Sequence, residues 1–125
     1  MTQIFKTTCA AIGLASLGLL AFAISPALAD IHCASEPGIS SVNSNVATNM
    51  VFKAVGENDE TQFKIYWINF EGQRQEYRHL FAGETWSVNT YLSHPWLVTA
   101  PVPGGGEDCI AIYLPSENRR TVVLD

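Results

Sequence analysis

The feature that most limits the fold of this chain is a series of short runs rich in β-branched and aromatic residues, separated by turn-forming residues. From Ile39 onward, no long stretch has the apolar spacing of an amphipathic helix. The runs predict strands at residues 39–44, 48–55, 62–70, 76–80, 85–91, 96–100, 109–114 and 121–124. Seven or eight short strands at this spacing predict an all-β fold, a β sandwich in a single domain.

Residues 1–29 have the pattern of a secretory signal peptide. Lys6 is followed by an uncharged run rich in Ala and Leu, and Ala27 and Ala29 form an A-x-A cleavage site. A membrane anchor is the alternative, but the Thr, Ser and Gly residues in the run disfavour it. We expect cleavage before Asp30, so the mature protein would be periplasmic or secreted and would not be attached to a membrane.

Two cysteines follow the expected cleavage point, Cys33 and Cys109. An oxidising compartment favours a disulfide between them, and two unpaired thiols are the alternative. A structural metal site is a weaker reading, because His32 adjoins Cys33 but no Cys-x-x-Cys or His-x-x-x-His spacing accompanies it. No cofactor and no metal are expected.

The charge and the glycine-rich run exclude two kinds of phosphate ligand. The formal net charge is −5, and the Lys and Arg residues are scattered, which argues against a nucleic-acid partner. The run 104–106 consists of glycines, but the Lys-Ser/Thr pair of a phosphate-binding loop is missing and no helix pattern follows. This run is predicted to be a flexible connector.

Strand alternation assigns side chains of residues 66–70 to two faces. Tyr66, Ile68 and Phe70 share one side of the predicted strand, while Trp67 and Asn69 point to the other. We expect the first set to lie in the core.

The same alternation applies to residues 94–97. If Pro95 and Leu97 point inward, His94 and Trp96 face outward. Trp96 would then join Trp67 in an exposed aromatic cluster, which on a soluble domain usually marks a contact surface.

Several of these segments together resemble the β domain of the von Hippel-Lindau (VHL) tumour suppressor. The segments are KIYWINFEG at 64–72, Tyr77, TYLSHPWL at 90–97 and IYLPS at 112–116, and SVNS at 41–44 resembles that domain's first strand. The resemblance assigns residues 39–125 to a VHL-like β domain, which follows an N-terminal segment, residues 30–38, that carries one disulfide cysteine. The β sandwich of that family agrees with the predicted strands.

The VHL β domain binds an extended peptide that carries 4-hydroxyproline. By resemblance, the ligand-binding residues here are Trp67, Tyr77, Asn89, Thr90, Tyr91, His94 and Trp96. The two tryptophans and Tyr77 would surround the pyrrolidine ring, and Thr90 and His94 would hydrogen-bond its hydroxyl. The Tyr77 phenol and backbone groups near Asn89 would bind the peptide main chain, with Tyr91 close to the rim.

The chemistry of these side chains suits such a ligand. An aromatic box fits an apolar ring, and a polar pair left unpaired by plain proline would favour the hydroxylated form by about 1–3 kcal/mol. Thr90 stands where the family has serine, Asn89 replaces a histidine and Pro95 replaces an aliphatic residue. No counterpart of the helical domain that recruits a ubiquitin ligase scaffold follows Leu124, so we expect peptide recognition without ubiquitination.

Two other classes of function remain open. A hydrolase would use His94 with Thr90 or Ser93 and an acid such as Glu84, but no nucleophile elbow, oxyanion loop or metal-ligand motif is present. A protein–protein interaction or inhibitor domain would use a sheet edge or the acidic loop at 57–60 to bind another exported protein. The expected function is a non-catalytic peptide-binding module that anchors a hydroxyproline, or a proline, of a partner peptide or protein segment in its aromatic pocket.

Overall fold

The computed structural model describes residues 30–56 and 61–125, so the expected signal peptide and the acidic loop 57–60 lie outside the described residues. The described part is all-β, which confirms the prediction. Its elements are the 3₁₀ helix η3 (Cys33–Gly38) and the strands β2 (Ala47–Ala54), β3 (Gln62–Ile68), β4 (Arg74–Phe81), β5 (Thr85–Tyr91), β6 (Trp96–Pro101), β7 (Glu107–Tyr113) and β8 (Arg120–Leu124).

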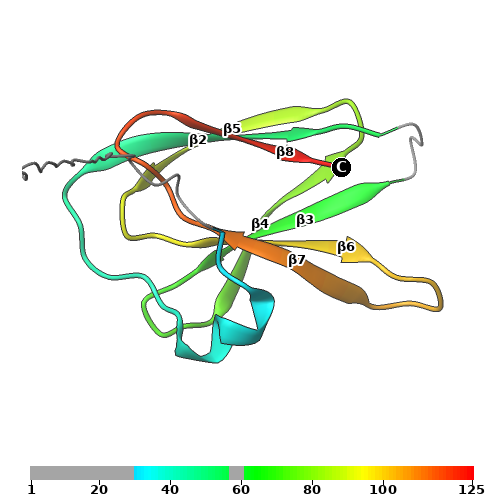
Figure 1. The fold of residues 1–125 in the computed structure, drawn as a ribbon, viewed down its shortest axis with the longest axis horizontal. Coiled ribbons are helices and arrows are strands. Elements are labelled where there is room, and N and C mark those ends of the chain that lie inside the picture. The colour runs from blue at the N-terminus through cyan, green and yellow to red at the C-terminus, as the bar shows by residue number, and fades with distance from the viewer. Residues whose placement is uncertain (1–29, 57–60) are drawn as a thin grey trace, which may run out of the picture.

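These seven strands form a sandwich of two sheets. The three-stranded sheet has the order β5-β2-β8, and the four-stranded sheet has the order β4-β3-β6-β7 (Figure 1). Strand β8 runs parallel to β2, and the other pairs are antiparallel. Strands β4 and β5 are edge strands of different sheets and are joined by the short turn at 82–84, so the two sheets are linked along this side.

The main core lies between the two sheets and is formed by side chains from both. Phe52 of β2 is fully buried, and its ring lies 6.1–6.4 Å from the rings of Trp86, Trp96 and Tyr113. Deleting a buried phenylalanine ring typically costs about 3–5 kcal/mol, so this cluster is a major source of stability. The other buried members are Met50, Ala54, Phe63, Ile65, Leu80, Val98, Val122 and Leu124.

The predicted faces of β3 are wrong in part. Phe63, Ile65 and Trp67 point into the main core, so Tyr66 and Ile68 lie on the outer face of the four-stranded sheet. Phe70, which was also expected in the core, is 45% exposed.

The alternation at 94–97 led to a second error, because Trp96 is buried between the sheets instead of facing outward. Leu97 is also buried, but on the opposite face of the sheet, where a second core covers it. Both faces of β6 are therefore apolar, and alternation alone does not tell which one faces the other sheet.

The second core forms where the N-terminal segment covers the outer face of the four-stranded sheet. Ile68, Leu97 and Ile112 are fully buried there. The segment is held by two backbone hydrogen bonds between Ile31 and Ile112 and by a Cys33–Cys109 disulfide with a Cα–Cα distance of 6.0 Å. The disulfide prediction is confirmed.

The predicted strand at 39–44 is wrong, because these residues form an irregular segment between η3 and β2. Ser41 donates its backbone N–H to Asn69, whereas Val42 donates to Ser93 in a different loop. Since consecutive residues bond to different elements, no ladder forms.

The glycine run forms the loop of the β6–β7 hairpin. Gly104, Gly105 and Gly106 have φ values of 90°, 102° and 83°, which L side chains rarely adopt. Val102 donates its N–H to Gly106, and Gly105 donates to Val102. The run is thus a connector, as predicted, with a defined turn geometry.

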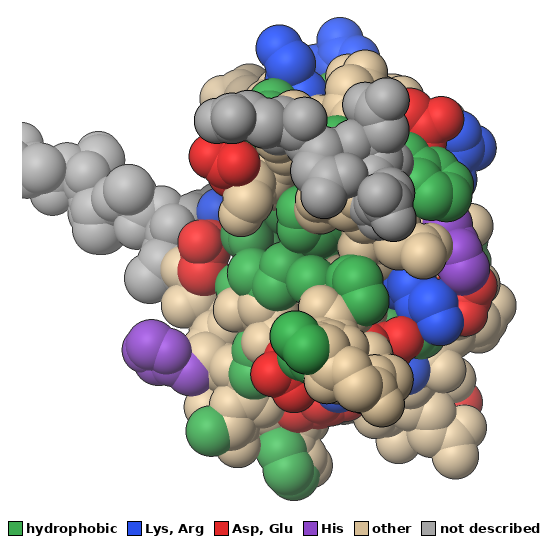
Figure 2. Space-filling view, turned by 90° about the vertical axis from the view of Figure 1, so that its right-hand side faces the viewer, with side chains coloured by type: hydrophobic (Ala, Val, Ile, Leu, Met, Phe, Trp, Pro, Cys, Tyr) green, Lys and Arg blue, Asp and Glu red, His purple; other side chains and the backbone are tan. Residues whose placement is uncertain are grey.

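One end of the sandwich is shown in Figure 2. Hydrophobic side chains gather near the centre of this face, with acidic and basic side chains mixed around them. In the described ranges, no helix is long and apolar enough to span a bilayer.

Candidate functional site

One hollow, of about 200 Å³, is lined by the same residues that the resemblance implied. They come from β3, β4, β5, β6 and the loop that joins β5 to β6: Trp67, Tyr77, Asn89, Thr90, Tyr91, His94 and Trp96. The hollow therefore lies along the side of the sandwich that the edge strands β4 and β5 form. The structure brings the seven residues together, and their role in ligand binding remains a prediction.

Three large aromatic side chains form the apolar part of this pocket. The ring centroids of Tyr77 and Trp96 are 5.0 Å apart with the planes at 81°, and those of Trp67 and Tyr77 are 6.3 Å apart at 86°. Such edge-to-face contacts stabilise aromatic pairs beyond their buried area. Trp96 is only 2% exposed and Trp67 is half-buried, so Trp96 belongs to the base of the pocket and Trp67 to its wall.

Tyr77 reaches the pocket because of an irregularity in the pairing of β4 with β3. The register pairs Ile65 with Arg78 but Tyr66 with Glu76, so Tyr77 is an extra residue that has no partner on β3. Such a β-bulge bends the strand and changes the direction of a side chain. Tyr77 is 46% exposed and is the most accessible of the three aromatic walls.

Thr90 supplies a hydroxyl next to the aromatic base. Its Oγ1 accepts a hydrogen bond of 3.0 Å from the Trp96 indole N–H, and Thr90 is itself only 3% exposed. Within the described chain this hydroxyl makes no other hydrogen bond, so its hydrogen can be donated to a ligand. Thr90 therefore both positions Trp96 and offers one donor to the pocket.

His94 lies among aromatic rings at the pocket wall. Its ring centroid is 5.5 Å from that of Trp67, 5.4 Å from that of Phe70 and 5.3 Å from that of Tyr91. Desolvation by these neighbours lowers the pKa of His94 below its ordinary value of 6.5, so the imidazole is neutral at neutral pH. A neutral imidazole has one donor and one acceptor nitrogen, so it can accept a hydrogen bond from a ligand hydroxyl.

Phe70 is a member of the site that sequence reasoning missed. Its ring is 5.5 Å from that of Trp67 in an edge-to-face contact and is partly exposed beside His94. Alternation assigned Phe70 to the core because it shares parity with Ile68. The strand ends at Ile68, however, so parity does not extend to Phe70.

Asn89 lines the pocket, and its side chain is already hydrogen-bonded within the sheet. Its side-chain Oδ1 accepts a hydrogen bond of 3.1 Å from Asn49 Nδ2, and Ser87 Oγ donates to Asn49 Oδ1 on the same side of the sheet. At the two ends of the β2–β5 ladder, the Leu92 N–H donates to the Val46 carbonyl and the Ala54 N–H donates to the Glu84 carbonyl. Because hydrogen-bonded positions alternate in an antiparallel pair, the even-numbered residues of β5 direct their backbone N–H and C=O groups toward β2. Those of Ser87 and Asn89 consequently face the open edge, where an extended peptide can pair with them.

Two of the side chains that a hydrolase was expected to use with His94 make other hydrogen bonds. The Ser93 hydroxyl donates to the backbone carbonyl of Val42, and Glu84 Oε1 accepts the backbone N–H of Phe81 at 2.8 Å. Both groups are therefore engaged elsewhere in the described structure. In those same residues, no group of three or more potential metal ligands gathers.

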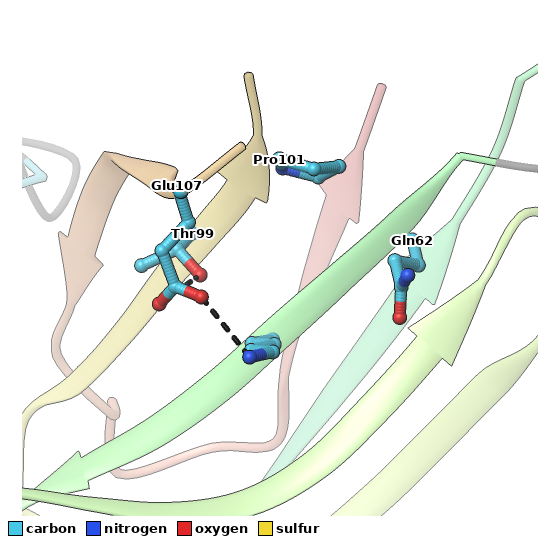
Figure 3. A pocket seen from close by; sticks show the side chains of 6 residues that line it. Gln62, Thr99, Pro101 and Glu107 are labelled. Atoms are coloured by element: carbon cyan, nitrogen blue, oxygen red, sulfur yellow. Dashed lines mark hydrogen bonds and ion pairs between the residues drawn. The ribbon is translucent and has the colours of Figure 1, made fainter. Parts of the chain in front are cut away.

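A second hollow, of about 140 Å³, lies on the outer face of the four-stranded sheet (Figure 3). Its carboxylate, Glu107, accepts hydrogen bonds from the Tyr66 hydroxyl at 2.5 Å and from Thr99 at 3.1 Å, and pairs with Lys64 at 3.1 Å. The Tyr66 bond is the main cause that lowers the pKa of Glu107, while burial and then this bond raise the pKa of Tyr66 to about 12. Since the carboxylate already has three partners, this hollow fits a structural role.

The comparisons with known proteins agree with this geometry. A family model described as the VHL beta domain matches residues 39–106, which is more than half of the chain. A search of curated proteins found no match.

Proposed function

The chain belongs to the VHL β domain family, and from this premise we propose that its aromatic pocket binds a proline, preferentially 4-hydroxyproline, within an extended peptide. Members of the family are non-catalytic domains that bind peptide segments. The observation that carries the proposal is the meeting of aromatic walls with Thr90 and His94 around one hollow.

The aromatic walls suit the ring of proline. Trp67, Tyr77 and Trp96 lie at large interplanar angles to one another, so they enclose a space on more than one side. A pyrrolidine ring is apolar and has polarised C–H bonds, which favour contact with aromatic faces. Burial of one such ring supplies an anchor for the whole peptide.

The polar pair distinguishes hydroxyproline from proline. The Thr90 hydroxyl donates to the ligand oxygen, because its own oxygen already accepts from Trp96. The ligand hydroxyl then donates to the neutral ring of His94. Plain proline leaves both groups unpaired, which weakens its binding. The methyl group of Thr90, absent from a serine, narrows the pocket and favours ligands without a further substituent on the ring.

The peptide main chain is proposed to pair with β5. The backbone groups of Ser87 and Asn89 face the open edge of the three-stranded sheet, next to the pocket. Addition of a strand at such an edge gives affinity that depends little on sequence, while the pocket selects one side chain. The proposed setting is the periplasm or the exterior of the cell, after removal of residues 1–29.

The test is a calorimetric titration of oxidised residues 30–125 with two extended peptides that differ only in proline or 4-hydroxyproline. We expect the hydroxylated peptide to bind at least about tenfold more tightly, a difference of roughly 1.4 kcal/mol. His94→Ala should remove this preference, and Trp67→Ala should weaken both peptides. Phe81→Ala is the matched control, because Phe81 is an exposed aromatic residue of β4 outside the pocket. Absence of binding by both peptides would refute the proposal.

A further inference from the structure

We propose that the irregular segment at residues 41–42 is a clamp that sets the geometry of the pocket from outside it. In this clamp, Ser41 is the positioning residue for Trp67, and the contact of Val42 with Ser93 positions His94. The inference rests on the proposed function, since it assigns a different part of ligand recognition to each half of the clamp.

Ser41 fixes the aromatic wall through its hydroxyl. The hydroxyl oxygen accepts a hydrogen bond of 2.8 Å from the Trp67 indole N–H and donates one of 2.6 Å to the Ile68 carbonyl. Ser41 is only 4% exposed, and its backbone N–H donates to Asn69 at 3.0 Å. The Trp67 ring also lies beside the rings of Phe70 and Tyr77, but its indole N–H is directed by the hydrogen bond to Ser41, which therefore helps to fix the orientation of this wall.

Val42 fixes the loop that carries His94. Its N–H donates to the Ser93 carbonyl at 3.3 Å, and the Ser93 hydroxyl donates back to the Val42 carbonyl. These two bonds hold the residue immediately before His94. The His94 N–H in turn donates to the Tyr91 carbonyl at 3.1 Å, and the Pro95 carbonyl accepts from the Ile68 N–H at 3.1 Å, so backbone bonds hold the chain before and after His94.

The clamp is itself anchored, which makes it a firm support. Ile39 precedes it and donates its N–H to Glu36 at 2.9 Å at the end of η3, and the disulfide joins this helix to β7. A Cβ at Gly72 would lie 3.1 Å from the Ile39 carbonyl oxygen, so the β3–β4 turn also packs tightly on the segment. Because the pocket is ordered before the ligand arrives, binding loses less conformational entropy.

The two halves of the clamp predict different binding defects. Ser41→Ala should weaken the proline and hydroxyproline peptides by the same factor, about fivefold, because one supporting hydrogen bond to the shared wall is lost. Ser93→Ala should weaken the hydroxyproline peptide selectively, because only that ligand uses His94. Ser116→Ala is the matched control, since it removes a hydroxyl-to-carbonyl bond of 2.6 Å in an exposed turn. Ser41→Thr retains the hydroxyl and should restore part of the affinity.

A spectroscopic measurement tests the clamp independently of any ligand. In the wild-type protein, the Trp67 indole N–H should exchange with solvent more slowly than that of Trp86, which has no hydrogen-bond partner in the described structure. Ser41→Ala should shift the Trp67 indole resonance and accelerate its exchange. This measurement on the wild type remains informative if Ser41→Ala does not fold.

The outcomes separate the two proposals. If the wild type binds neither peptide but its Trp67 indole is protected, the proposed function fails and the clamp stands. If the Trp67 indole exchanges as fast as that of Trp86, or if Ser41→Ala and Ser93→Ala both bind like Ser116→Ala, the clamp is refuted.

Discussion

Replacement of Thr90 by valine tests whether one hydroxyl supports both the core and the pocket. Valine has nearly the same shape as threonine but lacks the oxygen that accepts the hydrogen bond from Trp96. Thr90 is 3% exposed and Trp96 2%, so the indole N–H would stay buried without a partner. An unsatisfied buried donor costs about 1–3 kcal/mol, so we expect the free energy of unfolding to fall by about 2 kcal/mol.

Thr90→Ser is the control for this experiment, because it keeps the oxygen and removes one methyl group. Loss of a buried methyl group costs about 1 kcal/mol, so this variant should be more stable than Thr90→Val. Urea unfolding followed by tryptophan fluorescence gives both free energies, provided the m-values agree. Thr90→Ser should also retain the preference for hydroxyproline, which Thr90→Val should lose. If the valine variant proves as stable as the serine variant, the hydroxyl does not stabilise Trp96 and our reading of the pocket base is wrong.

Three further predictions follow from the structure. Replacing Cys33 and Cys109 together by alanine should lower the free energy of unfolding by about 2–4 kcal/mol, because the disulfide links residues 76 apart; an unchanged urea midpoint would contradict this. Glu107 has a lowered pKa in the folded protein, so the unfolded state binds more protons as the pH falls below about 4.5. The stability that the ionised carboxylate contributes is therefore present above pH 4.5 and is lost as the pH falls further. Glu107→Gln should flatten this acid dependence of the free energy of unfolding in urea titrations. His94 also has a lowered pKa, so its neutral form contributes stability that is present above pH 6.5 and is lost as the pH falls toward the folded pKa. The affinity for the hydroxyproline peptide should decline over the same pH range. An affinity that does not depend on pH would exclude His94 as a hydrogen-bond acceptor for the ligand.

The sequence predicted the strands well where turn-forming residues bound them. Each described strand lies within a few residues of a predicted run, because β-branched and aromatic residues alternate with Gly, Asn and Pro turns. The run at 39–44 has the same composition, but Ser41 bonds to the end of β3 and Val42 to the β5–β6 loop. Such partners are fixed by tertiary structure, and local pattern does not contain them.

The faces of the strands were harder to predict than their positions. The rule of alternation assumes one buried face, whereas the N-terminal segment buries Ile68 and Leu97 on the second face of the four-stranded sheet. Each of these two strands therefore has a fully buried apolar residue on its second face, Ile68 on β3 and Leu97 on β6. The pocket residues were identified from the order of motifs, which did not require the faces to be correct. Ser41 was noticed only as part of the first strand, because its bond to Trp67 depends on a contact across 26 residues.

The parallel pairing of β8 with β2 has a consequence for how this protein folds. Phe52 lies opposite Val122 and Ala54 opposite Leu124, so the first and the last strand of the described residues pair in one sheet. A contact of such long range forms only after a large loop closes, which slows folding. The sandwich cannot be completed until residues 120–124 are available. We therefore expect a slow final folding step in which β8 pairs with β2 and closes the core.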